Sequence, residues 1–347
     1  MTLSDVARDA GVSPATASRV LSGRYSVPDA TRARVERSVR KLGYVANMHA
    51  RVLAGALSRI VAVLTSDVTS AFYGRIVEGI EQEAVAAGRM CILVTTQNDP
   101  GRESAMLSLL REQNAEVVVL VGGVDAENEA YRNRMAELAR TLDAAGSRLV
   151  LIGRPSPSPD APVTVVEYDA VGGALAITSH LLSMGHQRVL FLGGTPGSTT
   201  TSARVEGYRK ALAGFGIETD PELVVHGRST RNFGYETITR LLDAGRPDFT
   251  AVFACDDLVA AGAMTALRER GLDVPGDISV AGYDDLPQSV DLVPPLTTVN
   301  VPLAQLGRAA VQLALRRTED AAAGQHVMLG THVVVRHSVR PRFAPRA

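Results

Sequence analysis

Two capped helices joined by a glycine turn open the chain. In MTLSDVARDAGVSPATASRVL, Thr2 is a favourable N-cap, Asp5 completes a capping-box spacing, and apolar residues recur at helical period. Gly11 ends this first helix, because glycine readily adopts the left-handed conformation of a sharp turn. Ser13 caps a second helix that has Pro14 at its first position, where the missing N–H costs nothing. The pattern predicts a helix-turn-helix whose second helix is suited to the DNA major groove.

The distribution of charge favours DNA binding over the other interpretation of this pattern, a helical hairpin whose polar side chains face water. Residues 1–58 hold nine Lys or Arg and four Asp or Glu, a net charge of +5. The whole chain has a net charge of −1, so residues 59–347 carry −6. A basic head on an acidic body is typical of a protein that contacts phosphates at one end. Single-stranded or RNA binding is disfavoured, because no series of aromatic residues accompanies the basic ones.

Length and composition limit the class of protein. A chain of 347 residues exceeds one ordinary core, and we expect two to three domains. The chain opens on a capped helix rather than on a signal peptide, and no apolar run reaches the ~18 residues of a membrane span. Cys91 and Cys255 are too few and too far apart for a disulfide framework or a zinc site. We therefore expect a cytoplasmic, nucleoid-associated protein with no membrane partner, metal or cofactor.

The rest of the basic head contains a third helix and a shorter segment. Residues 31–42 have apolar residues on one face and basic residues on the others, and Gly43 follows them. Asn47 can then cap a short helix that contains Ala50 and Leu53. A helix of seven residues is marginal by itself, so it needs DNA or a dimer mate in order to fold. A plain linker is the alternative interpretation of this segment.

After residue 58 the sequence alternates apolar strands with amphipathic helices, in two successive series. The pattern predicts doubly wound α/β structure with parallel sheets and two lobes. The expected strands of the first series are 59–65, 90–96, 116–123 and 148–153. The second series begins with strands near 163–169 and 188–194 and continues through the segments ELVVHG, AVFACDD and ISVAGYDD.

The body shows no pattern typical of an enzyme. Its glycine pairs lack the spacing of a dinucleotide fingerprint, and no GxSxG, HExxH or Walker A motif is present. Cys255 precedes Asp256, but no histidine lies nearby in the sequence to activate a nucleophile. A buried cysteine at the end of a strand is the favoured interpretation. We expect a protein that binds a ligand rather than one that transforms it.

Four segments carry a resemblance that continues through nearly the whole chain. TLSDVARDAGVSPATASRVLSG, TRARV, GYVAN and ARVLAG resemble the head and hinge of the lactose-repressor/galactose-repressor (LacI/GalR) family. Ala46 and Met48 depart from the family's usual hinge residues, which makes folding of the hinge costlier without DNA. The resemblance implies an all-α helix-turn-helix head, a hinge helix and a two-lobed core like that of periplasmic sugar-binding proteins.

The domain boundaries follow from that analogy. We expect the head at 1–45, the hinge helix and linker at 46–58, an effector-binding and dimerisation core at 59–341, and a tail at 342–347. Lobe 1 is expected at about 59–160 plus 293–325, and lobe 2 at about 161–292 plus 326–341. Residues 333–338 would add a late strand to lobe 2. The end of the chain contains no heptad helix, so we expect a dimer and no larger assembly.

The resemblance assigns DNA contacts to the head and hinge. Arg19 can bind guanine bidentately, whereas Pro14 and Ala15 offer only apolar contacts to base edges. Leu53 matches the wedge that the family inserts between central base pairs from the minor groove, beside Asn47 and Ala50 of the hinge. The remaining positions match contacts to phosphates, which fix the register: Thr2, Ser13, Thr16, Ser18, Ser22, Ser26 and Thr31.

The resemblance also assigns an effector site to the core, where polar residues follow strand ends. Arg204 matches the family's effector-clamping arginine. Asp256 matches a position that is often Asn or Asp, and Asp284 matches a carboxylate that accepts hydrogen bonds from hydroxyl groups. Phe72 and Tyr73 match ring contacts of the first lobe. Each also has a structural interpretation, as a surface ion pair or as plain core, and Asp169 is expected to be structural. The chain has no Trp, so any stacking platform must come from Tyr or Phe, such as Phe233 or Tyr283, near a loop with Ser229 and Asn232.

These observations predict a homodimeric transcriptional regulator that binds a pseudo-palindromic double-stranded operator, and we expect it to act as a repressor. A small polyhydroxylated effector such as a sugar would control it by shifting the angle between the lobes. A nucleoside or a sugar phosphate is the alternative effector, and a stand-alone sugar-binding protein is the alternative class. The sequence does not decide whether the effector is an inducer or a corepressor.

Overall fold

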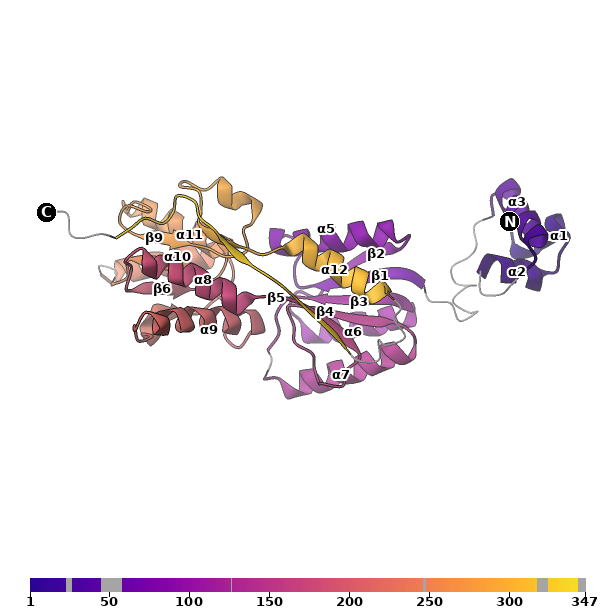
Figure 1. Ribbon diagram of the computed structural model, residues 1–347, viewed down its shortest axis with the longest axis horizontal. Helices are drawn as coiled ribbons and strands as arrows, with labels where there is room; N and C mark the ends of the chain where they lie inside the picture. The colour runs from indigo at the N-terminus through magenta and orange to yellow at the C-terminus, as the bar shows by residue number, and fades with distance from the viewer. Residues whose placement is uncertain (23–26, 45–57, 126, 246–247, 317–323, 343–347) are drawn as a thin grey trace.

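The computed structural model describes residues 1–22, 27–44, 58–125, 127–245, 248–316 and 324–342 (Figure 1). They form a helical head and two α/β lobes. Among them, no helix is both long and apolar enough to cross a membrane. The same residues contain no group of three His, Cys, Asp or Glu side chains arranged to hold a metal ion.

The head consists of α1 (Leu3–Ala10), α2 (Pro14–Ser22) and α3 (Asp29–Leu42). The predicted capping box is present, because the Thr2 hydroxyl accepts from the Asp5 amide and the Asp5 carboxylate accepts from the Thr2 amide at 2.9 Å. Gly11 adopts the left-handed conformation (φ 63°) that closes α1. A small apolar core fixes the three helices against one another: Val6, Ala7, Ala10, Ala17 and Val35.

The first lobe is a six-stranded parallel sheet in the order β11-β5-β4-β3-β1-β2. Its strands are β1 (Ser58–Thr65), β2 (Met90–Thr95), β3 (Ala115–Val121), β4 (Arg148–Ile152), β5 (Val163–Tyr168) and β11 (Gln325–Leu329). Four helices pack against it: α5 (Ala71–Ala86), α6 (Pro100–Glu112), α7 (Glu129–Ala144) and α12 (Leu303–Leu315).

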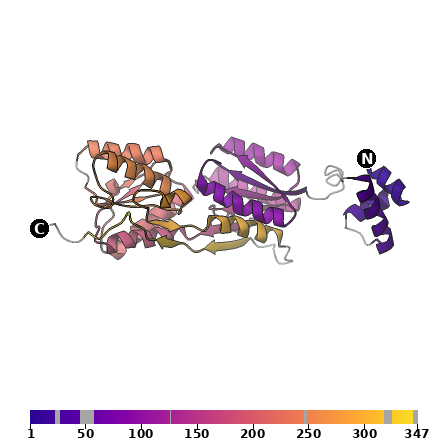
Figure 2. The ribbon, with the colours of Figure 1, turned by 90° about the horizontal axis from the view of Figure 1, so that it is seen from above.

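Both faces of this sheet are covered (Figure 2). Val61 and Val63 of β1 belong to the core that includes Ile76 of α5. Ala62 and Leu64, which alternate with them, belong to a second core that includes Leu142 of α7. Residues on the two sides of one strand are therefore all apolar, as a doubly covered parallel sheet requires.

The second lobe contains a four-stranded parallel sheet in the order β7-β6-β8-β9. The strands are β6 (Val189–Leu192), β7 (Val224–Val225), β8 (Ala251–Ala254) and β9 (Ser279–Ala281). The helices are α8 (Ala170–Ser183), α9 (Thr199–Gly214), α10 (Arg231–Asp243) and α11 (Asp257–Glu269), with short 3-10 turns at η1 (Pro221–Leu223) and η2 (Pro287–Val290). A two-stranded antiparallel sheet joins β10 (Thr298–Asn300) to β12 (His332–Val334).

Two assignments of segments to lobes differ from the sequence-based expectation. Residues 163–168, expected in lobe 2, form β5, which pairs with β4 of the first lobe. Residues 326–329, also expected in lobe 2, lie in β11, which pairs with β5. The chain therefore passes between lobes at Asp169, the N-cap of α8, rather than at 161. Both lobes contain buried parallel strands, so an apolar run identifies a strand without identifying its sheet.

The return crossing and the late strand differ in the same way. Residues 293–300, expected in lobe 1, include β10 and are bridged to lobe 2 at Ala281–Thr297 and Asp284–Asn300. The late strand, expected over 333–338 in lobe 2, is regular only at β12, where it pairs with β10 rather than with the four-stranded sheet. The remaining boundaries stay predictions, and the hinge helix at 46–58 lies almost wholly outside the described residues.

Candidate functional site

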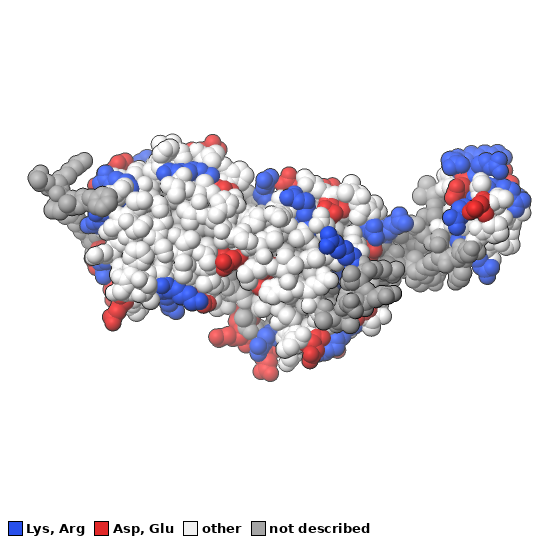
Figure 3. Space-filling view, in the orientation of Figure 1, with Lys and Arg blue, Asp and Glu red and all other residues white. Residues whose placement is uncertain are grey.

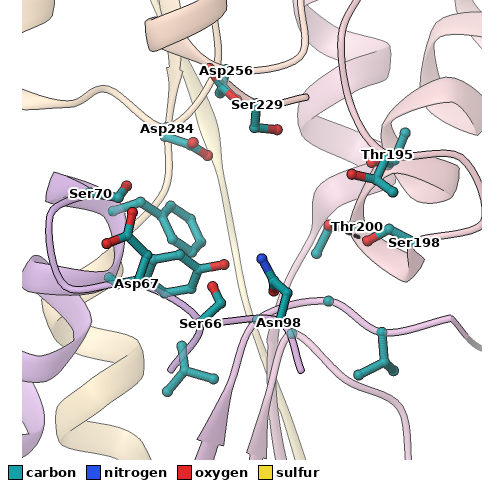
Figure 4. A pocket seen from close by; sticks show the side chains of 18 of the residues that line it. Ser66, Asp67, Ser70, Asn98, Thr195, Ser198, Thr200, Ser229, Asp256 and Asp284 are labelled. Atoms are coloured by element: carbon teal, nitrogen blue, oxygen red, sulfur yellow. Dashed lines mark hydrogen bonds between the residues drawn. The ribbon is translucent and has the colours of Figure 1, made fainter. Parts of the chain in front are cut away.

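A cleft of about 630 Å³ lies between the two lobes and is lined by the carboxyl ends of strands from both sheets (Figure 4). The first lobe contributes loops that follow β1, β2, β3 and β4, and the second contributes the first turns of α9, α10 and α11. Open parallel sheets bind ligands at this edge, because polar groups and helix N-termini converge there. All five residues predicted to bind the effector line the cleft: Phe72, Tyr73, Arg204, Asp256 and Asp284.

Arg204 and Asp284 form a buried ion pair in the wall of the cleft. Arg204 Nη2 lies 2.8 Å from Asp284 Oδ1, and their side chains are 9% and 5% exposed. The guanidinium also donates to the Tyr168 hydroxyl at 2.9 Å and to the Cys255 carbonyl, and its carbon lies 4.0 Å from the centre of the Tyr283 ring. The sequence left open a surface ion pair for these two residues. The structure shows a buried pair instead, in which each charge is stabilised by the other.

Asp284 is held in an uncommon state in two respects. Its φ is 100°, a region that residues other than glycine seldom adopt. Burial raises the pKa of its carboxyl to about 6, although the Arg204 charge opposes the shift. Asp284 therefore changes its charge close to neutral pH, at a position that faces the cleft.

Asp256 and Asp257 follow β8 and have different roles. Asp256 caps α11, accepting from the Val259 amide at 2.8 Å, and it lines the cleft. Asp257 is fully buried and accepts from the Leu286 amide and the Ser289 and Thr298 hydroxyls at 2.6–2.7 Å. Burial raises the pKa of Asp257 to about 7. The sequence analysis missed this residue, although two adjacent aspartates after a strand were a visible signal.

Cys255 and Asp169 have the structural roles expected from the sequence. Cys255 is 1% exposed, as a buried cysteine at a strand end should be, and burial raises the pKa of its thiol. Asp169 caps α8 through the Gly172 amide at 2.7 Å and does not line the cleft.

The aromatic surface of the cleft comes from the first lobe. The Phe72 and Tyr73 rings meet edge to face with centroids 5.2 Å apart, at the start of α5. Neither of the other suggested rings lines the cleft: Tyr283 is fully buried against Arg204, and Phe233 packs on Gly227. Ser229 lines the cleft, whereas Asn232 does not.

Further polar residues line the cleft that the sequence analysis did not select. They share one signal, a position immediately after a strand or at the start of a helix. Figure 4 labels most of this set: Ser66, Asp67, Ser70, Asn98, Asp125, Thr195, Ser198, Thr200 and Arg228. The lining residues include four aspartates and two arginines, and Asp284 already neutralises Arg204. The cleft is thus rich in hydroxyl and carboxylate groups.

The head presents its predicted second helix to solvent. Pro14, Ala15, Ser18 and Arg19 are exposed, while Ala17 is buried. The Ser13 hydroxyl caps the helix by accepting from the Thr16 amide at 3.1 Å. Basic side chains cover the α3 side of the head (Figure 3).

The other predicted DNA contacts are placed only in part. Thr2 is exposed and Thr31 is half-buried. Ser26, Asn47, Ala50, Leu53 and the Ser22 side chain lie outside the described part of the chain.

Comparisons with known proteins agree with this architecture. A family model described as bacterial regulatory proteins, lacI family, matches residues 2–47, and one for a periplasmic binding protein-like domain matches residues 178–339. The transcriptional regulator CelR of Thermobifida fusca is 35% identical over 344 residues, 97% of this chain and 98% of CelR.

Two solved structures are similar over the whole chain. The lac repressor dimer bound to operator and an anti-inducer has a TM-score of 0.81 and 28% identity, and 98% of this chain and 99% of that chain are covered. The CelR–cellobiose complex has a TM-score of 0.70 and 32% identity, with 97% and 99% covered. The relatives are transcriptional regulators and not enzymes. The chain belongs to the lacI family of DNA-binding bacterial transcriptional regulators.

Proposed function

We propose that this protein is a homodimeric repressor whose affinity for a pseudo-palindromic operator is controlled by an uncharged polyhydroxylated ligand, such as a sugar, in the interlobe cleft. The observation that carries the proposal is the Arg204–Asp284 pair in a wall of hydroxyl and carboxylate groups. The Arg204 Nε is buried with no hydrogen-bond partner among the described residues. Of two vicinal hydroxyl groups, one can donate to the carboxylate while its neighbour accepts from the guanidinium, whereas a hydrocarbon can do neither.

The charge of the cleft favours an uncharged sugar over a sugar phosphate. Once Asp284 has paired with Arg204, the described residues that line the cleft include three further aspartates, Asp67, Asp125 and Asp256, against one arginine, Arg228. A phosphate would meet a surplus of negative charge on the walls of the cleft. The related regulator CelR has been solved in complex with cellobiose. The cleft of this protein, at about 630 Å³, has the volume of a typical small-molecule site.

The head and hinge supply the DNA part of the proposal. Arg19 is exposed on α2 and is the residue best suited to read a guanine. Pro14 and Ala15 add apolar contacts, so the predicted hinge contacts of Asn47, Ala50 and Leu53 and the deformability of the operator supply further specificity. Leu53→Ala should weaken binding and reduce the operator bend. Such a role places the protein in the cytoplasm with the DNA.

A thermal-shift panel tests the effector class directly, because a ligand that binds the native state raises Tm by mass action. The panel contains neutral mono- and disaccharides, their phosphates, and nucleosides. We expect a neutral sugar to raise the Tm of the wild type, and Asp284→Asn to lose most of that shift. Asp243→Asn, at an exposed ion pair with Arg270, is the control and should keep it. A shift caused only by a phosphate, or one retained by Asp284→Asn, would contradict the proposal.

A further inference from the structure

We propose that Asp257 positions Asp284 for the effector, a role that rests on the function proposed above. Asp257 does not line the cleft, although Asp256 and Asp284 do. It holds the chain on both sides of Asp284–Asp285, a segment with an uncommon backbone conformation. Asp257 is therefore a positioning residue, which acts on the ligand through Asp284 and not by contact with it.

Asp284 and Asp285 both have left-handed φ values, 100° and 52°. Such values are uncommon for a residue with a Cβ, and they persist only where the surrounding structure enforces them. Here they accompany a divergence of the two side chains. Asp284 pairs with Arg204 in the wall of the cleft, whereas Asp285 pairs with Arg336 at 2.6 Å and accepts from the Asn300 side-chain amide at 2.9 Å. The direction of the Asp284 carboxylate thus depends on a backbone conformation that needs support.

Asp257 supports this segment at both ends. Its amide donates to the carbonyl of Tyr283, immediately before the segment, at 2.9 Å. Its carboxylate Oδ2 accepts from the amide of Leu286, immediately after the segment, at 2.7 Å. A change of Asp284 and Asp285 to common φ values moves these two flanking groups relative to each other, so it breaks at least one of the bonds.

The Asp257 carboxylate is itself fixed in a buried site. The Ser289 hydroxyl of η2 donates to Oδ2 and the Thr298 hydroxyl of β10 donates to Oδ1, each at 2.6 Å. The three residues are fully buried. A Cβ on Gly282 would lie 2.3 Å from Oδ1, so glycine at this position leaves the space that the carboxylate occupies. Hydrogen bonds to a carboxylate are strong where water is excluded, so this side chain can hold the loop in one arrangement.

The remaining bonds of Asp284 do not replace this support. Its amide donates to the Val299 carbonyl at 2.9 Å, and its carboxylate pairs with Arg204 at 2.8 Å. Both bonds act on Asp284 itself, and neither holds the chain that leaves Asp285. A side chain that binds a ligand must be held to within about 0.5 Å of its productive position. Loss of the Leu286 bond should therefore displace the Asp284 carboxylate far enough to weaken effector binding.

Two neutral variants separate the hydrogen bonds of Asp257 from its charge. In Asp257→Asn the amide oxygen can still accept from the Leu286 amide, while the NH2 group donates to the Thr298 hydroxyl, which can accept as well as donate. Asp257→Ala loses these bonds. Tyr208→Phe is the matched control, since it removes a buried hydrogen bond to the Val189 carbonyl in the same lobe and away from the cleft.

Isothermal titration calorimetry at pH 7 tests the effect on ligand affinity, and its probe is the sugar that gives the wild type its largest thermal shift. Asp257→Ala should bind this sugar about tenfold more weakly or worse, because a hydrogen bond between a carboxylate and the sugar is lost. Asp257→Asn and Tyr208→Phe should stay within about threefold of the wild type. Wild-type affinity in Asp257→Ala would overturn the proposal, and so would an affinity of Asp257→Asn as weak as that of Asp257→Ala.

If Asp257→Ala does not fold, Thr298→Val replaces it, and Thr298→Ser is the variant that keeps the hydroxyl donor to Oδ1 of Asp257. Thr298→Val should bind the sugar about threefold more weakly than Thr298→Ser, because the carboxylate that holds the loop has lost one of its bonds. Equal sugar affinities in these two variants would contradict the proposal.

Carbon-13 NMR of the aspartate carboxyl groups needs neither sugar nor DNA, so it separates failure of this role from failure of the proposed function. The Asp284 resonance is the one missing from Asp284→Asn. Burial raises the pKa of Asp284 to about 6. In Asp257→Ala this pKa should lie at least about one pH unit lower than in Asp257→Asn, because a displaced carboxyl group gains water. Equal pKa values in the two variants would overturn the role of Asp257, whereas a wild type that binds no sugar of the panel overturns the proposed function alone.

Discussion

Arg204 and Asp284 lie 80 residues apart in the sequence and meet at 2.8 Å in the wall of the interlobe cleft. Arg204 lies on α9 and Asp284 follows β9. The ion pair therefore joins a helix to the loop that returns the chain to the first lobe. Each charge is buried and needs the other, which makes this pair the electrostatic centre of the candidate effector site.

Sugar affinity should fall as the pH falls from 7 to 5. The pKa of Asp284 is about 6, and a hydroxyl donates to the carboxylate but not equally to the protonated acid. Most of the population is charged at pH 7 and only about a tenth is charged at pH 5, so we expect about tenfold weaker binding. Isothermal titration calorimetry, with the sugar that gives the largest thermal shift, measures the affinity at each pH. Asp284→Asn should bind weakly and with no such pH dependence; an equal pH slope in that variant would place the titrating group elsewhere.

Asp257→Asn should alter the pH dependence of unfolding. The folded pKa of Asp257 is about 7, above its unfolded value, so the native state binds the extra proton. This contribution to stability is fully present below the unfolded pKa and is lost as the pH rises through 7. The wild type should therefore gain stability relative to Asp257→Asn as the pH falls from 8 to 5, as measured by urea unfolding. A difference that is constant with pH would contradict the assignment.

Glu103→Gln should destabilise the protein by about 3–5 kcal/mol, because it leaves the Arg154 charge buried without its partner. Asp143→Asn, at the half-exposed pair with Arg148, is the matched control and should cost at most about 1 kcal/mol. Urea unfolding of the full chain gives both free energies. Similar small losses in the two variants would show that the buried network contributes little.

Arg19→Ala should relax DNA specificity at one operator position by about 1–3 kcal/mol. Arg37→Ala, another exposed arginine but on α3, should weaken binding evenly across sequences or leave it unchanged. Binding to a library of single-base operator variants distinguishes the two outcomes. If Arg19→Ala discriminates among the variants as well as the wild type does, Arg19 is not the base reader.

The sequence predicted the features that are local in the chain. The Thr2–Asp5 capping box, the turn at Gly11 and the Ser13 cap depend on residues a few positions apart, and the structure has all three. Asp256 and Asp284 could be placed together because strand ends of one sheet share an edge. Phe72 and Tyr73 came from resemblance, since an aromatic pair at the start of a helix fits a core equally well.

Contacts that depend on the arrangement of whole lobes could not be predicted. The Thr199–Val124 bonds form only at a particular interlobe angle, which no sequence period encodes. The Glu103–Arg154 pair joins residues 51 positions apart, and each looks like an ordinary surface charge in its own helix or loop. The membership of β5 in the first sheet was missed because its apolar run fits either lobe.

Reciprocal linkage tests the central claim, that the cleft and the head are coupled. The affinity for an operator duplex is measured with and without a saturating concentration of the sugar that gives the largest thermal shift. The affinity for that sugar is measured with and without saturating duplex. The account predicts that both affinities change by the same factor, within about 5–150-fold, because coupling free energy is shared by the two ligands. Two ligands that each bind tightly but leave the other's affinity unchanged would contradict it.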